Sequence, residues 1–346
     1  MTGISIRTAG RAGLIMLDRP QALNALTWDM VTAMTDALTR WRNDPDVAVV
    51  LIDGAGDRAF CAGGDIAEMY ATGTSGDLDY GRRFWRDEYR LNAMMSLYHK
   101  PIVSFLHGFT MGGGVGVGCH AHHRVVSETS QIAMPECGIG LVPDVGGSLI
   151  LARAPGHLGE YLGLTGDRMD AGDAIYSGFA DHLIPQSEWV DLKAALTESG
   201  DAGLVARTAH PAPQSRLAAW QGDIDQVFGA QDLGALLAGP SAVPSAPIAH
   251  ALDLMDKNSP LSMACSLSLI RAVRADPTIV TALEHEYRFT HRAMAQGDFL
   301  EGIRAALIDR DRTPHWRHAD RIVPASDIAA MTAPLGSDAL DLKDLT

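Results

Sequence analysis

Apolar and polar positions alternate over residues 4–17, around a glycine-containing turn at residues 9–13. This alternation predicts a pair of strands or a hairpin. Arg19-Pro20 then breaks the pattern. Thr27 precedes apolar residues at helical spacing, namely Met30, Met34, Leu38 and Trp41. Since a threonine hydroxyl can accept from the first free N–H groups of a helix, this segment predicts a capped amphipathic helix.

Continuous apolar runs follow, separated by segments of helical character. Residues 47–52 are bounded by Asp46 and Gly54, which is typical of a buried and parallel strand. Further strands are predicted at 102–106, 125–126 and 132–134, and a tightly packed helix of small residues at 113–120. Strands that alternate with helices indicate an α/β fold with parallel pairing and crossover connections.

The second half of the chain differs from the first in its composition and in the spacing of its apolar residues. The composition shifts near residues 196–250, where an Ala/Pro/Ser-rich stretch lies around 239–247, and this favours a linker or a mobile flap. From Pro260 onward the apolar residues recur at helical spacing. We therefore expect a core over residues 1–195 that carries the site, and a second part over 196–346 made of a flap or linker and a helical C-terminal region.

The composition narrows the functional classes. With 346 residues, 47% of them hydrophobic, the chain can bury a sizeable core. Its formal net charge of −14 argues against a surface for nucleic acid or anionic membrane, although backbone N–H groups could still hold a small anion. No signal or transit pattern and no long apolar span stand out, so a cytoplasmic protein is expected. The cysteines lack CxxC spacing and are expected to be buried, reduced thiols: Cys61, Cys119, Cys137 and Cys265.

Two glycine-rich segments, residues 60–66 and 107–114, follow predicted strands. A residue without Cβ lets a substrate oxygen approach the backbone closely, and two N–H groups presented in this way would form an oxyanion hole. Taken singly, each segment could equally be a tight strand-to-helix connection.

Rival motifs fail. The glycines of residues 114–118 do not complete GxGxxG, and neither a Walker GxxxxGK[ST] nor a GxSxG elbow is present. His285 begins like a zincin helix but lacks the second histidine, and residues 120–123 lack a matching ligand spacing. No metal site is expected.

Residues 133–147 place Glu136 and Asp144 in an apolar loop punctuated by glycine and proline. Carboxylates among Met, Ile, Leu and Val neighbours favour a desolvated crevice, where burial raises their pKa and suits them to acid/base or nucleophilic work. Solvated loop acids are the alternative.

Together these segments resemble the crotonase (enoyl-CoA hydratase/isomerase) superfamily over nearly the whole chain. The resemblance lies in residues 19–26, 60–66 and 111–114. It implies a ββα superhelix with a helical C-terminal region, in which the N–H groups of Ala62 and Gly113 polarise a thioester carbonyl. It also implies that CoA is received by the backbone of Asn24, Ala25, Ala62, Gly63, Gly64, Asp65 and Ile66.

The resemblance also bears on the reaction. Hydratases of the superfamily carry two glutamates that share a water, and Gly116 occupies the place of the first. The loop at 135–147 and the segment 298–316 are instead similar to the superfamily's 3-hydroxyisobutyryl-CoA hydrolases. In that branch Glu136 would attack the thioester or activate water, and Asp144 would orient the reacting group or relay a proton. Glu88 would bind the substrate hydroxyl, unless it is an ion-pair partner of the neighbouring arginines.

Hydrolysis of a short-chain 3-hydroxyacyl-CoA thioester is therefore the expected reaction, with 3-hydroxyisobutyryl-CoA, an intermediate of valine catabolism, as the leading substrate. CoA would be part of the substrate, and no separate cofactor is expected. Alternatives are a hydratase or isomerase on the same fold, and a non-catalytic acyl-CoA-binding protein. A homo-oligomer is left open, since relatives of the superfamily often trimerise.

Overall fold

A computed structural model describes residues 3–239 and 244–345, and its larger sheet has six strands in the order β1-β2-β3-β5-β7-β9. β1 and β2 pair antiparallel as the predicted hairpin, whereas each later strand runs parallel to its neighbour. The strands are β1 (Ile4–Ala9), β2 (Ala12–Leu17), β3 (Val49–Gly54), β5 (Ile102–Leu106), β7 (His123–Val126) and β9 (His182–Leu183).

A second sheet of three parallel strands lies beside the first. It comprises β4 (Ala59–Cys61), β6 (Phe109–Met111) and β8 (Gln131–Ala133). Three strands of the large sheet, β3, β5 and β7, are thus each followed by a strand of the small sheet and then by a helical segment. This repeat is the ββα superhelix that the resemblance implies, and it confirms the fold class.

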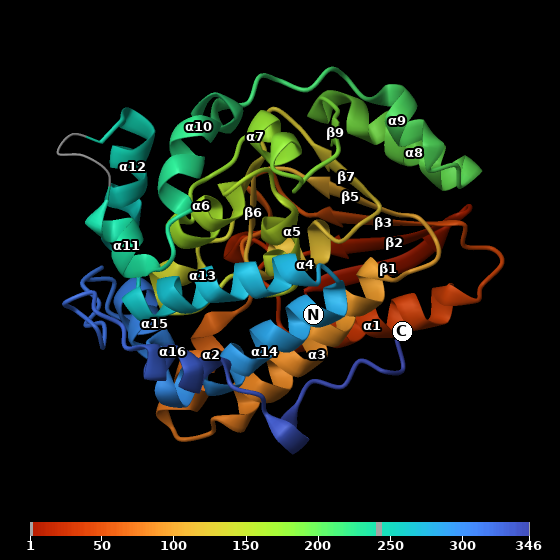
Figure 1. The fold of residues 1–346 in the computed structure, drawn as a ribbon. Coiled ribbons are helices and arrows are strands. Elements are labelled where there is room, and N and C mark those ends of the chain that lie inside the picture. The colour runs from red at the N-terminus through yellow and green to blue at the C-terminus, as the bar shows by residue number, and fades with distance from the viewer. Residues whose placement is uncertain (1–2, 240–243, 346) are drawn as a thin grey trace.

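Sixteen α-helices cover these sheets within the described residues (Figure 1). They are α1 (Trp28–Arg42), α2 (Ile66–Thr74), α3 (Asp79–Ser96), α4 (Gly113–Gly118), α5 (Gly147–Arg153), α6 (Leu158–Thr165), α7 (Ala171–Tyr176), α8 (Trp189–Ser199), α9 (Gly203–Thr208), α10 (Arg216–Phe228), α11 (Leu233–Ala238), α12 (Ala246–Met255), α13 (Pro260–Ala275), α14 (Ile279–Gln296), α15 (Phe299–Ile303) and α16 (Ala325–Thr332). Short helical turns are η1 (Pro20–Ala22), η2 (Glu136–Ile139), η3 (Gln186–Glu188), η4 (Arg304–Ile308, a π-turn) and η5 (Gly336–Asp338). None of the described helices is long and apolar enough to cross a membrane.

The elements predicted from periodicity form for the expected reasons. The Thr27 side chain accepts from Met30 N–H at 3.3 Å and caps α1. One face of that helix buries the predicted residues Met34, Leu38 and Trp41. The apolar run at 47–52 becomes β3, which is paired on both sides by parallel strands. The four cysteines are buried and free, as predicted.

The expectation of a linker or flap over residues 196–250 is wrong for the described part of that segment. It forms α9 to α12, whose buried residues include Leu217, Ile224 and Phe228. These side chains belong to the same hydrophobic cluster as residues of α1 and α3, so the segment completes the main core. Residues 240–243 of the Ala/Pro/Ser-rich stretch lie outside the described residues.

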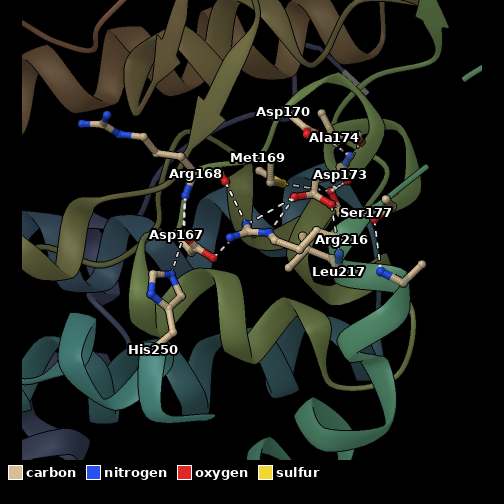
Figure 2. A network of polar contacts seen from close by, with 12 residues as sticks. Asp167, Arg168, Met169, Asp170, Asp173, Ala174, Ser177, Arg216, Leu217 and His250 are labelled. Atoms are coloured by element: carbon tan, nitrogen blue, oxygen red, sulfur yellow. Dashed lines mark hydrogen bonds and ion pairs between the residues drawn. The ribbon is translucent and has the colours of Figure 1, made fainter. Parts of the chain in front are cut away.

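A polar network fastens α10 to the core (Figure 2). The Arg216 guanidinium lies 3.0 Å from Asp167 and 3.2 Å from Asp173. Asp167 also accepts from Tyr161 at 2.6 Å and contacts His250 of α12 at 3.2 Å. Because both aspartates are buried, they depend on these partners for the stabilisation of their charge.

Candidate active site

The loops predicted to carry the chemistry meet at one cavity of about 150 Å³. The elements that line it include the loop after β4, the N-terminus of α4, the turn η2, the middle of α3 and the start of α15. The lining residues divide into a polar end and an apolar wall. They are Ala62, Gly63, Gly64, Ile66, Met69, Phe84, Trp85, Glu88, Gly112, Gly113, Pro135, Glu136, Ile139, Leu141, Asp144, Val145 and Phe299.

Glu88 and Glu136 flank the turn that begins α4. A Cβ on Gly112 would lie 2.9 Å from Glu136 Oε1, and one on Gly113 would lie 2.8 Å from Glu88 Oε1. Gly112 has a φ of +50°, which side chains rarely adopt, so glycine is needed there for both backbone shape and space. Two carboxyl groups therefore flank the turn that was predicted to present N–H donors.

Both glutamates keep an oxygen without a hydrogen-bond partner in the described structure, Oε1 of Glu88 and Oε2 of Glu136. Both side chains are buried, and burial with the nearby Asp144 charge holds each pKa well above its usual range. The ion-pair alternative for Glu88 is wrong, because the arginines of α3 that form ion pairs do so with aspartates. Unpartnered buried carboxyl oxygens facing a cavity indicate groups that serve a ligand.

Asp144 is the third buried acid of the cavity. Its Oδ2 accepts from Tyr89 O–H at 2.8 Å, and burial raises its pKa to about 7 in spite of that bond. Tyr89 lies one residue after Glu88 on α3 and also contacts Thr290 of α14 at 3.4 Å. Tyr89 could not be identified from the sequence, since a tyrosine in an amphipathic helix is usually an ordinary core residue.

Two further residues hold the Asp144 loop from outside the cavity. His120 Nε2 lies 2.8 Å from Val145 O, so this nitrogen must be the donor, and burial lowers the histidine pKa to about 4. Glu286 of α14 accepts from Gly146 N–H at 2.7 Å and Ser148 N–H at 3.1 Å. Burial raises the Glu286 pKa to about 8. The sequence singled out His120 as a metal-ligand candidate and Glu286 only within an incomplete zincin motif; both instead fix the backbone of the Asp144 loop.

The predicted oxyanion donor Ala62 needs correction. Its N–H donates to Leu23 O at 3.0 Å, so this proton is already used inside the protein. Among the described residues no acceptor is bound to the N–H of Gly64 or of Gly113, and both residues line the cavity. A Cβ on Gly113 would lie 3.2 Å from Gly64 N, which places the two backbones face to face. The geometry therefore assigns the pair of free donors to Gly64 and Gly113.

The segment predicted to receive CoA pairs with the same loop. Leu26 N–H donates to Gly63 O, and Asp65 N–H to Leu26 O, each at 2.8 Å. Asn24 is completely buried, and its carboxamide bonds to Arg19 N–H, Ala55 O and Ala59 O. Asn24 is thus a scaffold beneath the loop rather than a contact surface for CoA, which corrects that prediction.

The other predicted CoA contacts remain accessible to different degrees. Ala25 lies beside the loop with its carbonyl bonded to Arg19, and Asp65 forms an ion pair with the same arginine at 3.0 Å. Gly63, Gly64 and Ile66 line the cavity directly. A role of these residues in binding CoA stays a prediction.

Gly116 lies on α4 one turn beyond Gly113, and no space is left beside it. A Cβ there would lie 2.7 Å from Asn92 Nδ2 and 2.8 Å from Val145 Cβ. Asn92 is completely buried and both polar atoms of its side chain lack a partner in the described structure. A second carboxylate of the hydratase type has no room at position 116.

No group of three or more His, Cys, Asp or Glu residues within the described ranges is arranged to hold a metal ion. What the cavity does combine is two free N–H donors, three buried carboxyl groups and an apolar wall. Donors of this kind stabilise an oxyanion, and a carboxylate can attack an acyl carbon or activate water. The arrangement suits acyl transfer.

Comparison with known proteins adds an independent finding. A sequence profile described as "Enoyl-CoA hydratase/isomerase" matches residues 12–331. The chain is 35% identical to the mitochondrial 3-hydroxyisobutyryl-CoA hydrolase of Rattus norvegicus, over 96% of this chain and 89% of that protein. It is 36% identical to the probable 3-hydroxyisobutyryl-CoA hydrolase 3 of Arabidopsis thaliana, over 88% and 84%.

Solved structures carry other names. An enoyl-CoA hydratase from Rhodobacter sphaeroides superposes with a TM-score of 0.95 at 53% identity, covering 98% of this chain and 99% of that one. A carnitinyl-CoA dehydratase from Mycobacterium thermoresistibile gives 0.93 at 39% identity, covering 99% of both. The fold is common to all of these proteins, while their names divide between hydrolysis and hydration.

Proposed function

The chain belongs to the enoyl-CoA hydratase/isomerase family, and from that premise we propose that it hydrolyses a short-chain 3-hydroxyacyl-CoA thioester, foremost 3-hydroxyisobutyryl-CoA. One observation carries the choice of hydrolysis over hydration. Glu136 faces the two free N–H donors, whereas the place of a second hydratase glutamate at Gly116 is filled by Asn92 and Val145. The names of the hydrolase relatives support the same reaction.

The thioester carbonyl oxygen would accept from Gly64 N–H and Gly113 N–H. These donors stabilise the negative charge that develops on the oxygen when the carbonyl carbon is attacked, and backbone groups fixed in a loop and a helix start need no reorganisation. Removing one such donor typically lowers kcat about 10²- to 10³-fold.

Glu136 would supply the attack in one of two ways. As a nucleophile its carboxylate displaces CoA as thiolate and forms an acyl anhydride, which water then cleaves. As a general base it takes a proton from water, whose oxygen displaces the thiolate directly. In both routes one water is consumed and the products are the free acid and CoA thiol.

The remaining acids would recognise the substrate. Glu88, whose pKa is raised by burial, can accept from a hydroxyl on the acyl group, and in its protonated form it can also donate. Asp144, held by Tyr89, would orient the reacting group or relay the proton to the leaving thiolate. This choice of a hydroxylated acyl group accords with a place in valine catabolism and, like a cytoplasmic location, is a prediction.

The test is release of CoA thiol from 3-hydroxyisobutyryl-CoA, followed with a thiol reagent. Wild-type protein should turn over, and Glu136→Gln should lower kcat by about 10²-fold or more, because the amide neither attacks nor accepts a proton. Asp79→Asn, an exposed change on the same helix as Glu88, serves as control and should leave the rate unchanged.

Absence of thiol release by the wild type would contradict the proposal. Loss of the conjugated absorbance of crotonyl-CoA at a comparable rate would favour the hydratase that the solved structures name. Binding of CoA esters with neither reaction would favour a non-catalytic binding protein. Label found in the Glu136 carboxylate after a single turnover in H₂¹⁸O would establish the nucleophilic route, because water oxygen enters that side chain only by attack on its carbon in an anhydride.

A further inference from the structure

The apolar wall of the cavity includes one side chain from the far end of the chain. Phe299 is the first residue of α15, is fully buried, and lines the same cavity as Glu136. Its ring centroid lies 5.4 Å from that of Trp85 on α3, with the planes tilted by 53°. The two rings form an aromatic wall, and Glu88 on the same helix as Trp85 also lines the cavity.

The residue before Phe299 anchors this wall. The Asp298 carboxylate accepts from Ser259 O–H at 2.6 Å and from Arg317 N–H at 3.1 Å. Its side chain is buried, and its carbonyl accepts from Gly302 N–H at 2.9 Å. Phe299 is thereby fixed from two segments that are distant in sequence, at Ser259 and Arg317, and from within its own helix at Gly302.

The same short helix lies directly on the turn that carries Glu136. A Cβ on Gly302 would lie 2.2 Å from Ile139 O, and one on Gly140 would lie 2.5 Å from Asp298 O. Backbone therefore touches backbone on both sides of the turn η2. A rigid contact of this kind leaves the Phe299 ring little freedom to retreat when a larger acyl group enters.

We propose that Phe299, packed on Trp85, is the residue that sets the upper size of the acyl group and restricts the enzyme to short branched acyl chains. This inference rests on the proposed function, because the cavity is taken to hold the acyl end of a CoA thioester. The cavity is small, about 150 Å³, and Phe299 lines it together with Glu88, Gly64 and Gly113, the groups that would hold the hydroxyl and the carbonyl. Shortening the ring should extend the cavity along this wall.

The experiment compares kcat/KM for 3-hydroxyhexanoyl-CoA and 3-hydroxyisobutyryl-CoA in the wild type, Phe299→Leu and Phe299→Ala. The ratio of the longer to the shorter substrate should rise at least about 10-fold in the variants, since pocket size discriminates by one to two orders of magnitude per methylene. Phe228→Leu is the matched control. Phe228 is equally buried but lies on α10 and does not line the cavity, so its loss should lower stability and leave the ratio unchanged.

A second measurement keeps the inference separate from the hydrolysis reaction. Affinities for the inert thioethers S-propyl-CoA and S-hexyl-CoA are determined by calorimetry. The wild type should prefer the propyl compound, and Phe299→Leu should lose that preference. Equal ratios in wild type and Phe299→Leu, in turnover or in thioether binding, would overturn the role of Phe299. Failure of the wild type to hydrolyse any ester, with the thioether preference intact, would overturn only the proposed function.

Discussion

At the scale of single residues, the site is distinguished by four buried acids without a compensating cation. Glu88, Glu136, Asp144 and Glu286 all have a raised pKa, and no arginine or lysine of the described chain forms an ion pair with any of them. Four carboxylates confined in this way cannot all be ionised at neutral pH, so the cluster retains protons. On the proposed function, the ionisation of the cluster, rather than that of one residue, would govern the reactivity of Glu136.

We expect Tyr89 to influence this ionisation through its hydrogen bond to Asp144. Its O–H donates to Asp144 at 2.8 Å, and a bond to the charged form lowers the pKa of the acid. Tyr89→Phe removes that donor, so the pKa of the cluster should rise further above 7, and the acid limb of the pH profile of kcat/KM should move to higher pH. Steady-state rates between pH 5 and 9 measure this shift.

The control for Tyr89→Phe is Tyr98→Phe. Tyr98 is buried as well, but its O–H donates to Leu38 O away from the acids. Its variant should keep the wild-type pH profile. An acid limb that stays in place in Tyr89→Phe, or moves to lower pH, would show that this bond does not tune the acids.

The acids could be identified from the sequence, but the residues that hold them in place could not. Glu136 and Asp144 stand out because charged residues are rare among apolar loop neighbours. The choice between Ala62 and Gly64 as oxyanion donor is different in kind, since it depends on which N–H the segment at residues 23–26 consumes. A hydrogen bond between two loops leaves no trace in either loop's composition.

At the scale of elements, α4 shows how glycines let a helix pack where a side chain has no room, as at position 116. Gly116→Ala should cost about 1 to 3 kcal/mol of unfolding free energy, because the new Cβ would meet Asn92 and Val145 inside 3 Å. Gly222→Ala is the matched change in the helix α10, where nothing lies within 4 Å. There, alanine should stabilise by about 0.5 to 1 kcal/mol. Urea unfolding of both variants makes the comparison, and a neutral Gly116→Ala would contradict it.

Long elements were easier to predict from the sequence than short ones. The helix α1 and the strands β3 and β5 carry several periods or an unbroken apolar run, and they form where predicted. β4 and β6 have three residues each, too few for a period, and lie inside segments that read as glycine-rich turns. The small sheet was therefore invisible as a sheet, although the family resemblance implied it.

At the scale of the whole molecule, the expected linker turns out to be a packed helical layer. Its sequence is rich in small and polar residues because few buried side chains per helix suffice when ion pairs complete the attachment. Arg216 is the centre of that attachment in Figure 2, where it joins α10 to Asp167 and Asp173. Composition alone does not distinguish such a layer from a flexible segment.

Arg216→Met tests how firmly this layer is held. Two buried aspartates lose their cation, and breaking a buried pair typically costs about 3 to 5 kcal/mol, somewhat less here since Arg216 is partly exposed. Thermal unfolding should shift accordingly, and limited proteolysis should open residues 200–239 first. Arg207→Met removes an exposed pair with Asp201 and should leave the unfolding temperature nearly unchanged, because solvent screens such a pair. Equal effects of the two changes would refute a special role of Arg216.

The late position of Phe299 and Glu286 in the chain also bears on synthesis. A ribosome adds about 5 to 20 residues per second, and folding proceeds as segments emerge. The loops that hold Glu136 and the free N–H groups leave the ribosome long before α14 and α15 are synthesised. Only then can these two helices support the loops and close one side of the cavity. On the proposed function, a nascent chain would therefore carry the residues of its site before the helices that support them, and the cavity would take its final shape only once those helices have docked.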